Sequence, residues 1–305
     1  MNIVFMGTPD FAATSLKELI SAGHNVSAVF TQPDKPVGRK RIITPPPVKV
    51  LALENNIEVY QPETLKDGVA AEIISKLKPD AIAVVAYGKL IPENILNIAP
   101  LGCINVHGSL LPKLRGAAPI QWSVINGEEY AGVTTMYMDK GLDTGDIILT
   151  DKTRILEGET SGELYERLAP LGAKLLLKTL ELLKEGKAER IAQNNDESTY
   201  APMLNKEMAE IDFSKDAKKL CSLICGLNPW PVAYTFFEGK RLKVFRAILA
   251  EGNGEAGTIL DNKKLTVACG EGAITLLEVG LEGSKAQSGE EFMRGHRLSK
   301  GSKIV

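Results

Sequence analysis

The chain has 305 residues, of which 44% are hydrophobic and 24% charged, and its formal net charge is −2 at neutral pH. This length exceeds the usual size of one domain, so two domains are expected. The charge argues against a general nucleic-acid binder. The sequence has no run of about 18 apolar residues, so no transmembrane helix is expected.

The N-terminus and the cysteines indicate where the protein works. Residues 1–7 have neither the basic region nor the small-residue cleavage site of a signal peptide, and they are predicted to begin a strand. The four cysteines (103, 221, 225 and 269) are too scattered for a disulfide framework. Cys221 and Cys225 lack the second pair of ligands that a zinc site needs. We therefore expect a cytoplasmic protein with reduced thiols and no metal.

The first part of the chain is expected to form a Rossmann-like, doubly wound α/β domain with a mostly parallel sheet. Apolar runs and helical periodicity predict strands at 3–6, 26–30, 57–60 and 81–86, with helices between them at 10–22, 48–55 and 66–77. The last of these strands is apolar throughout, as expected of a parallel strand buried on both faces. The turn at residues 7–9 lacks two glycines of the dinucleotide fingerprint, so NAD-type binding is not expected.

Residues 31–47, rich in Pro, Lys and Arg, are predicted to form an exposed loop. Five basic residues fall within fifteen positions that contain no acid: Lys35, Arg39, Lys40, Arg41 and Lys49. If the partner is an RNA, an acidic protein must hold it through a local basic patch such as this one. The alternative is an ordinary solvated loop.

A change of polarity marks the end of the next predicted strand, Cys103 to Val106. Asn105 and His107 are two residues apart, so their side chains leave a strand on the same face. Gly108 then permits a turn. Ligands of open α/β sheets bind at the carboxyl ends of the strands, which places this stretch and the loop at 87–92 on one rim. Taken alone, an Asn-x-His more often satisfies backbone groups.

A helix at 119–126 and a strand at 132–138 are predicted before an acidic turn at 139–146. A strand at 147–150 and a long amphipathic helix at 160–184 follow it. The spacing of the aspartates in the turn does not fit a calcium loop. Local turn chemistry is the simpler explanation for Asp143 and its neighbours taken alone.

The rest of the chain is expected to form a smaller domain. We predict a catalytic domain at 1–188, a polar linker at 189–206 and a C-terminal domain at 207–305. After a helix at 215–225, short strands are predicted at 233–237, 242–247, 257–260, 265–269 and 273–279. Five such strands are typical of a small β-barrel of the OB type.

Asn105, His107 and Asp143 would together suit acyl transfer without a protein nucleophile. The Asn105 amide and a protonated His107 can donate hydrogen bonds to the oxygen on which charge develops. Asp143 would favour the protonated imidazole and accept a proton from an attacking amine. Ser109 is not held in Gly-x-Ser-x-Gly, so a serine hydrolase is not expected.

The run from Asn105 to Pro112 closely resembles the signature of folate-dependent formyltransferases. Together with Arg115 to Trp122, the basic loop and Asn228 to Pro231, it resembles the methionyl-tRNA formyltransferase family over essentially the whole chain. The resemblance implies transfer of a formyl group from 10-formyltetrahydrofolate to the α-amine of methionine on initiator methionyl-tRNA, for translation initiation.

The resemblance also assigns residues. Asn105, His107 and Asp143 match the catalytic trio. The implied folate-binding residues are Ser109, Leu110, Leu111 and Pro112, with Leu90 and Ile91 beside the pterin. The implied tRNA-binding residues are Arg39, Lys40 and Arg41, helped by the C-terminal domain. No metal, membrane or DNA is implied.

Three alternatives remain open from the sequence. Formyltransferases for a glycinamide ribonucleotide or an amino sugar nucleotide would share the trio but not the basic loop and the barrel. A formyl-folate hydrolase would keep the trio and use water as acceptor. A non-catalytic RNA-binding module is disfavoured, because polar groups at strand ends cost stability unless they are used or satisfied.

Overall fold

A computed structural model describes residues 1–38 and 40–304. Arg39, one of the predicted tRNA-binding residues, therefore lies outside the described residues. The contacts divide the chain into two compact units. Unit 1 comprises residues 1–116, 132–152 and 165–200, and unit 2 comprises residues 117–131, 153–164 and 201–305. Within the described ranges, no helix is long and apolar enough to cross a membrane.

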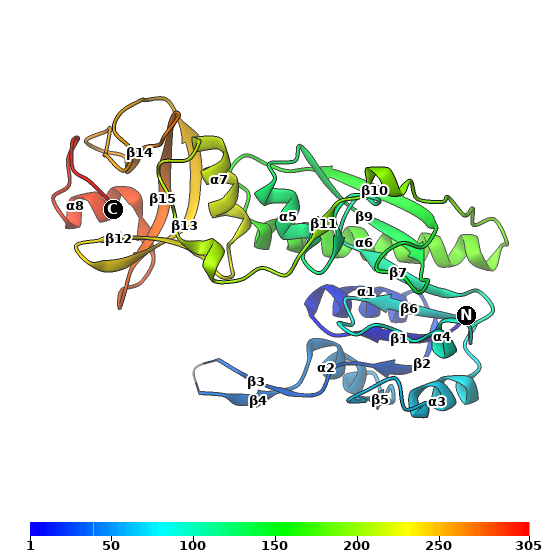
Figure 1. Cartoon of the computed structure of the whole chain (residues 1–305). Coiled ribbons are helices and arrows are strands. Elements are labelled where there is room, and N and C mark those ends of the chain that lie inside the picture. The colour runs from blue at the N-terminus through cyan, green and yellow to red at the C-terminus, as the bar shows by residue number, and fades with distance from the viewer. Residues whose placement is uncertain (39, 305) are drawn as a thin grey trace. The chain divides into compact units, whose positions relative to one another are not determined.

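Unit 1 is built on a seven-stranded sheet in the order β10-β9-β7-β6-β1-β2-β5 (Figure 1). Five of its strands pair in parallel: β1 (Asn2–Gly7), β2 (Asn25–Phe30), β5 (Val59–Tyr60), β6 (Ala81–Val85) and β7 (Cys103–His107). Next to them, β9 (Tyr130–Tyr137) pairs antiparallel with β7, and β10 (Ile147–Arg154) forms the edge. The predicted Rossmann-like, mostly parallel sheet is confirmed.

Helices cover both faces of this sheet, which explains its continuously apolar strands. The helices of unit 1 are α1 (Asp10–Ser21), α2 (Pro47–Glu54), α3 (Val69–Leu77), α4 (Glu93–Leu96) and α6 (Ser161–Lys184). Val4 and Met6 of β1 share one buried cluster with residues of α3 and α4. On the other face, α6 comes close enough that a Cβ added at Gly172 would lie 3.1 Å from Val106 of β7. Because strand side chains alternate, Asn105 and His107 leave β7 on the face opposite α6.

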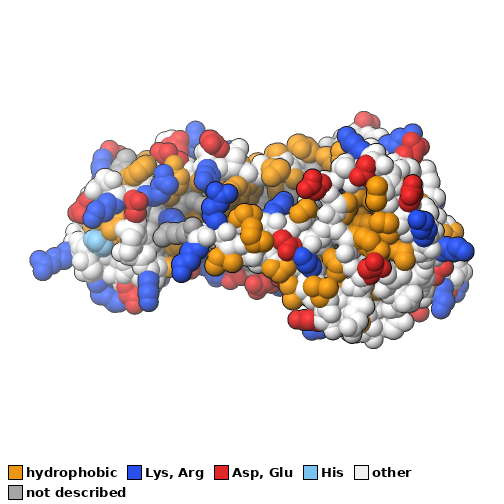
Figure 2. All heavy atoms as spheres, turned by 90° about the horizontal axis from the view of Figure 1, so that it is seen from below, with side chains coloured by type: hydrophobic (Ala, Val, Ile, Leu, Met, Phe, Trp, Pro, Cys, Tyr) orange, Lys and Arg blue, Asp and Glu red, His pale blue; other side chains and the backbone are white. Residues whose placement is uncertain are grey.

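Residues 31–47 contain more structure than the predicted loop. β3 (Lys35–Val37) and β4 (Ile42–Thr44) pair antiparallel as a hairpin in which all six residues are exposed. Val37, Ile42 and Ile43 are 56–62% exposed. On the face shown in Figure 2, hydrophobic side chains and Lys or Arg side chains both reach the surface. The alternation that usually identifies strands is missing, because neither face of this hairpin is buried.

The segment between 189 and 206 is more ordered than its polar sequence indicates. Ile191 exchanges backbone hydrogen bonds of 2.8 and 2.9 Å with Ile147. A short helix, η1 (Asn195–Glu197), follows, and β11 (Tyr200–Ala201) then pairs with β8 (Arg115–Gly116). Backbone hydrogen bonds hold this segment without apolar periodicity, which is why the sequence pattern does not reveal its structure.

Unit 2 contains an antiparallel sheet, as predicted. Its strands are β12 (Ala233–Phe237), β13 (Lys240–Ala250), β15 (Ala273–Leu281) and β14 (Thr266–Ala268), with β16 (Gln287–Ser288) beside β15. The predicted strand at 257–260 is present only as isolated bridges at Thr258 and Ile259. Closure of this sheet into an OB barrel stays a prediction.

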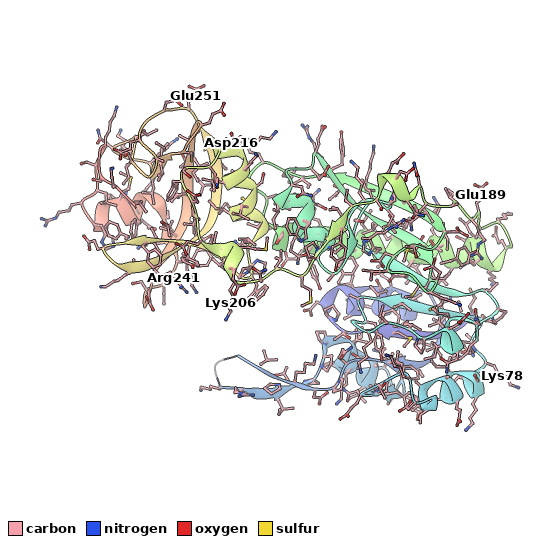
Figure 3. All side chains as sticks on the ribbon, viewed as in Figure 1. Lys78, Glu189, Lys206, Asp216, Arg241 and Glu251 are labelled. Carbon is pink, nitrogen blue, oxygen red and sulfur yellow. The ribbon has the colours of Figure 1, made fainter. Side chains whose placement is uncertain are left out.

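The helices that lie wholly in the described part of unit 2 are α5 (Pro119–Ile125), η2 (Glu207–Ala209), α7 (Ala217–Gly226) and α8 (Gly289–Gly295). The sequence analysis missed α8, which begins with a capping box made by Ser288 and Glu291. Lys206 and Arg241 extend outward from unit 2 (Figure 3). The Arg241 guanidinium lies 4.1 Å from the centre of the Tyr234 ring.

The contact between α6 and β7 gives a stability prediction. Replacing Gly172→Leu places a branched side chain where even a Cβ meets Val106 at 3.1 Å and Phe11 at 3.4 Å. Overpacking of this kind costs about 3 kcal/mol, and the free energy of unfolding in urea should fall accordingly. Lys174→Leu, on the exposed side of the same helix, is the matched control and should change stability by less than about 0.5 kcal/mol. Equal stabilities of the two variants would mean that α6 does not approach the sheet at Gly172.

Candidate active site

β7 carries two of the predicted site residues at its carboxyl end. Asn105 and His107 are 8% and 6% exposed. Asn105 pairs with Val84 of β6 and Met136 of β9, and His107 pairs with Thr134 of β9. Pairing on both sides fixes the backbone of Asn105, and pairing with β9 fixes that of His107. The amide side chain of Asn105 has no hydrogen-bond partner among residues 1–38 and 40–304, so its donors are available to a ligand.

The His107 ring lies between two acceptors. Its Nε2 is 2.9 Å from the carbonyl oxygen of Leu114, and its Nδ1 is 3.6 Å from Oδ2 of Asp143. A carbonyl only accepts, so Nε2 carries the hydrogen. The distance from Nδ1 to Asp143 is too long for a direct hydrogen bond. Nδ1 is therefore the ring nitrogen that can gain or lose a proton or meet another group.

Asp143 reaches this ring from the turn at 139–146, as the predicted trio requires. Its Oδ2 accepts a 2.8 Å hydrogen bond from the backbone N–H of Gly116. Asp139 supplies the local turn chemistry instead, since its Oδ1 accepts from the N–H of Gly141 and the hydroxyl of Thr144. The turn is tight at Gly145, where an added Cβ would lie 1.8 Å from the carbonyl oxygen of Tyr137.

The predicted folate segment directly follows His107. The Ser109 hydroxyl donates to the carbonyl of Lys113 at 2.7 Å, so this side chain holds its own loop. Leu111 is buried with Met136 and Ile147. Leu110 packs against β9 at Gly132, where an added Cβ would lie 2.4 Å from it, and Pro112 is half-buried.

Leu90 and Ile91, the predicted pterin neighbours, lie on the loop after β6. Leu90 is 77% exposed, whereas Ile91 is 7% exposed and belongs to the core beneath α3 and α4. Of the two, only Leu90 offers its side chain to a ligand in this structure.

Two other titratable groups near these strands are unsuited to catalysis. Burial raises the pKa of the Cys103 thiol, and burial raises the pKa of the Tyr87 phenol to about 12. Both therefore stay protonated near neutral pH and supply neither a nucleophile nor a base. No group of three or more His, Cys, Asp or Glu in the described part of the chain is arranged to hold a metal ion.

The predicted basic patch divides into two parts. Lys35, Lys40 and Arg41 are exposed on the hairpin. Lys49 does not belong with them, because its Nζ lies 2.8 Å from both carboxylate oxygens of Asp34. The stretch without acidic residues runs from position 35 to position 49. Asp34, which pairs with Lys49, is the residue directly before it.

Sequence reasoning missed the residues that hold the turn around Asp143. Gln193 donates hydrogen bonds to the backbone carbonyls of Asp143 and Gly145, and it accepts from Arg115. Gln193 lies in the polar segment predicted to be the linker, about fifty positions from the turn. Nothing in the sequence pattern of that segment indicates the contact.

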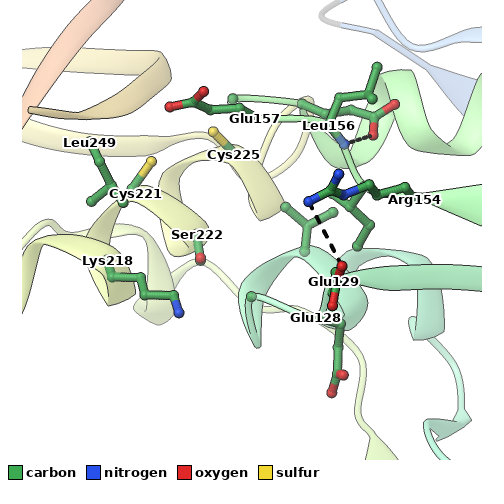
Figure 4. Close-up of a pocket in the computed structure, with 15 residues that line it drawn as sticks. Glu128, Glu129, Arg154, Leu156, Glu157, Lys218, Cys221, Ser222, Cys225 and Leu249 are labelled. Atoms are coloured by element: carbon green, nitrogen blue, oxygen red, sulfur yellow. Dashed lines mark hydrogen bonds and ion pairs between the residues drawn. The ribbon is translucent and has the colours of Figure 1, made fainter.

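Unit 2 has a cavity of about 500 Å³ that contains none of the predicted site residues (Figure 4). An ion pair between Arg154 and Glu129, 3.8 Å long, lies on one side of it. On another side, the thiols of Cys221 and Cys225 both donate to the carbonyl of Ala247. This cavity does not help to identify the site that the strand ends of unit 1 predict.

Comparison with known proteins assigns the chain to a class. Residues 1–180 match the family model for formyl transferase, and residues 203–297 match the formyl transferase C-terminal domain. WlaRD, a sugar 3N-formyl transferase solved in the presence of dTDP and 5-N-formyl-THF, shares the fold with a TM-score of 0.69 and 20% identity. That match covers 93% of this chain and 99% of WlaRD. Fold and family models together define a formyl transferase.

The HypX protein from Aquifex aeolicus, solved in complex with tetrahydrofolic acid, also shares the fold. Its TM-score is 0.62 at 17% identity, over 99% of this chain and 50% of HypX. Curated relatives are much closer in sequence. The methionyl-tRNA formyltransferase of Desulforamulus reducens is 51% identical over 307 residues, covering 99% of this chain and 97% of the relative. The methionyl-tRNA formyltransferase of Lachnospira eligens is 48% identical over 310 residues, which cover 99% of this chain and 98% of the relative. The chain belongs to the methionyl-tRNA formyltransferase family.

The tight turn at Gly145 gives a prediction for the site. Gly145→Ala would place a Cβ against the carbonyl of Tyr137, so the turn must move and carry Asp143 away from His107. A misplacement of about 1 Å can cost about 10²-fold in rate, and formyl-transfer kcat should fall by about that factor. Gly295→Ala is the control, because a Cβ there meets nothing within 4 Å. Normal kcat in Gly145→Ala would show that the position of the turn does not matter for transfer.

Proposed function

We propose that this protein transfers the formyl group of 10-formyltetrahydrofolate to the α-amino group of methionine on initiator methionyl-tRNA, in the cytoplasm, for translation initiation. The observation that carries the proposal is the arrangement of Asn105, His107 and Asp143 at the end of β7. It occurs in a chain related over 99% of its length to methionyl-tRNA formyltransferases.

The reaction needs one bond formed, one broken and one proton moved. The amine nitrogen attacks the formyl carbon, and negative charge develops on the formyl oxygen. Collapse of this intermediate breaks the bond between the formyl carbon and N10 of the folate. The amine loses a proton and N10 gains one, so no oxidant or further reactant is required.

Each side chain of the trio is placed to serve one step of this reaction. The Asn105 amide, which has no partner among the described residues, can donate to the formyl oxygen. His107 can donate from Nδ1 when it is doubly protonated, while Nε2 remains on the carbonyl of Leu114. Asp143 is anchored through Oδ2, and its Oδ1 has no partner within the described ranges, so it can accept the proton of the amine.

The donor assignment draws on the folate-linked segment. Residues 109–112 follow His107 without interruption, and the hydroxyl of Thr134 donates to the carbonyl of Ser109 at 2.6 Å. A loop held in this way can offer Leu110 and Pro112 to a flat pterin ring, with Leu90 exposed on the neighbouring loop. WlaRD and HypX, which share this fold, were solved with 5-N-formyl-THF and with tetrahydrofolic acid, which supports the same class of donor here.

The RNA partner requires positive charge on an acidic protein. We assign it to the hairpin residues Lys40 and Arg41 and, on sequence grounds alone, to Arg39. The C-terminal domain at 207–305, which carries a formal charge of +1, would add contacts through exposed cations such as Arg241. In this proposal, residues 1–188 form the catalytic domain and residues 189–206 connect the two.

Product formation from matched acceptors tests the function. The purified protein with 10-formyltetrahydrofolate should formylate initiator methionyl-tRNA. It should leave glycinamide ribonucleotide and amino sugar nucleotides unchanged, and it should release little formate to water. Rapid formate release without an acceptor would support a hydrolase instead. Binding of tRNA without any turnover of the donor would support an RNA-binding module.

The trio gives the first functional prediction. His107→Ala and Asp143→Asn should each lower kcat by about 10²–10⁴-fold, because each removes a group that handles protons. Asn105→Ala should lower kcat by about 10²–10³-fold, as expected for one donor to the developing oxyanion. Steady-state formylation of methionyl-tRNA measures all three effects. Asp151→Asn, an exposed aspartate on β10, is the control and should keep normal kcat. A trio variant with normal kcat loses its assigned role.

The hairpin formed by β3 and β4 gives the second functional prediction. Replacing Lys40 and Arg41 together with alanine should raise KM for methionyl-tRNA and flatten the salt dependence of tRNA binding, which follows the number of phosphates neutralised. KM for the folate donor should change by less than about twofold, because neither side chain contacts the trio. Lys66→Ala, an exposed lysine away from the hairpin, is the control. An unchanged salt dependence would return the hairpin to the status of an ordinary solvated surface.

A further inference from the structure

We propose that Gln193 is a positioning residue for formyl transfer, acting on Asp143 without touching substrate. Its Nε2 donates to the carbonyl of Asp143 at 2.9 Å and to the carbonyl of Gly145 at 2.7 Å. Its Oε1 accepts from Nε and Nη2 of Arg115 at 3.1 and 2.7 Å. One side chain thus ties the turn that carries Asp143 to the segment that follows the folate loop.

These contacts use the full capacity of the amide. A primary amide has two N–H donors and an oxygen with two lone pairs, and all four are engaged. Rotating the amide by half a turn would place its oxygen against two carbonyls and its nitrogen against a guanidinium, with no favourable contact left. The environment therefore fixes the orientation of Gln193.

Asp143 needs such support because its own backbone resists its position. Its φ of +55° lies in the left-handed region, which favours glycine and which an aspartate adopts only as a single, locally supported residue. Gln193 holds its carbonyl, and the N–H of Gly116 holds its carboxylate. Gly116 directly follows Arg115, so both anchors of Asp143 belong to one connected group.

Arg115 is itself fixed at a second point. Its Nη2 lies 2.9 Å from Oδ1 of Asn195, two residues beyond Gln193. Within the polar segment at 193–195, the side chains of Gln193 and Asn195 both accept hydrogen bonds from Arg115. Gln193 also donates hydrogen bonds to the Asp143 turn. Apart from these contacts and the hydrogen bond from Gly116, no described hydrogen bond holds Asp143, so its separation of 3.6 Å from the His107 ring depends on them.

The first experiment measures transfer and rests on the proposed function. Gln193→Ala should lower kcat for methionyl-tRNA by about 10–100-fold and change KM for the folate donor by less than about twofold. Gln193→Glu separates two roles, because a carboxylate still pairs with Arg115 but cannot donate to the two carbonyls. If Gln193 positions Asp143, Gln193→Glu should be as slow as Gln193→Ala. Recovery of kcat in Gln193→Glu would mean that only neutralisation of Arg115 matters.

A double-mutant cycle provides a readout that a general loss of stability would not give. In an Asp143→Asn background, adding Gln193→Ala should lower kcat by less than about threefold, because the group that Gln193 positions is already disabled. Full additivity would overturn the proposal. Asn194→Ala changes the neighbouring residue, which has no contact with the turn, and should leave kcat unchanged from that of its parent in each of the two backgrounds.

The second measurement does not depend on activity. The chain has three histidines, so the ring ¹⁵N signals can be assigned by single substitution. In Gln193→Ala the His107 signals should shift while those of His24 and His296 stay in place, and Asn194→Ala should shift none of them. Unchanged His107 signals would overturn the proposal even if the protein transfers no formyl group. If Gln193→Ala shifts the His107 signals but the wild-type protein transfers no formyl group, the positioning contact is supported and the proposed function is rejected.

Discussion

The burial of two polar side chains at the end of β7 is the constraint on which the rest of unit 1 depends. A buried polar group without a partner costs about 1–3 kcal/mol. His107 avoids that cost at Nε2 through the carbonyl of Leu114, while its Nδ1 faces the carboxylate of Asp143 at 3.6 Å. The Asn105 amide has no hydrogen-bond partner among the described residues, but it is not among the side chains with buried unpaired atoms, so its polar end remains accessible. A strand end that keeps an unpaired amide beside a paired imidazole is prepared for a ligand that supplies the missing acceptor.

The direction of β9 explains why the Asp143 turn needs so much support. β9 pairs antiparallel with β7, so Tyr137 at its end lies beside Ile104, near the start of β7. The chain must then come back by about three residues of strand, roughly 10 Å, to bring Asp143 to His107. Two local features allow this reversal of the chain: the left-handed backbone of Asp143, and Gly145, where there is no room for a Cβ. The distant means are Gln193 and the N–H of Gly116.

Much of this fold follows from the sequence because periodicity responds to burial. The apolar run of β6 and the spacing of Asn105 and His107 predicted a parallel sheet with a polar rim, and both are present. The hairpin formed by residues 35–37 and 42–44 escaped prediction because none of these six residues is buried. Lys49 was misjudged for a different reason: its partner Asp34 is distant in sequence but close in space, and a charge count along the chain does not register such pairs. The contact between Gln193 and the turn is invisible for the same reason.

The role of the 189–200 segment bears on what counts as the catalytic unit. A polar stretch between two domains reads as a connector, and a fragment ending at 188 would keep every residue of the trio. It would nevertheless lack Gln193 and Asn195, and therefore the side chains that hold Arg115 and the Asp143 turn. The compact unit formed by the contacts extends to Tyr200, which includes them. The strand ends carry the chemical groups, but the geometry of those groups depends on residues that carry no chemistry of their own and lie where the pattern predicts a linker.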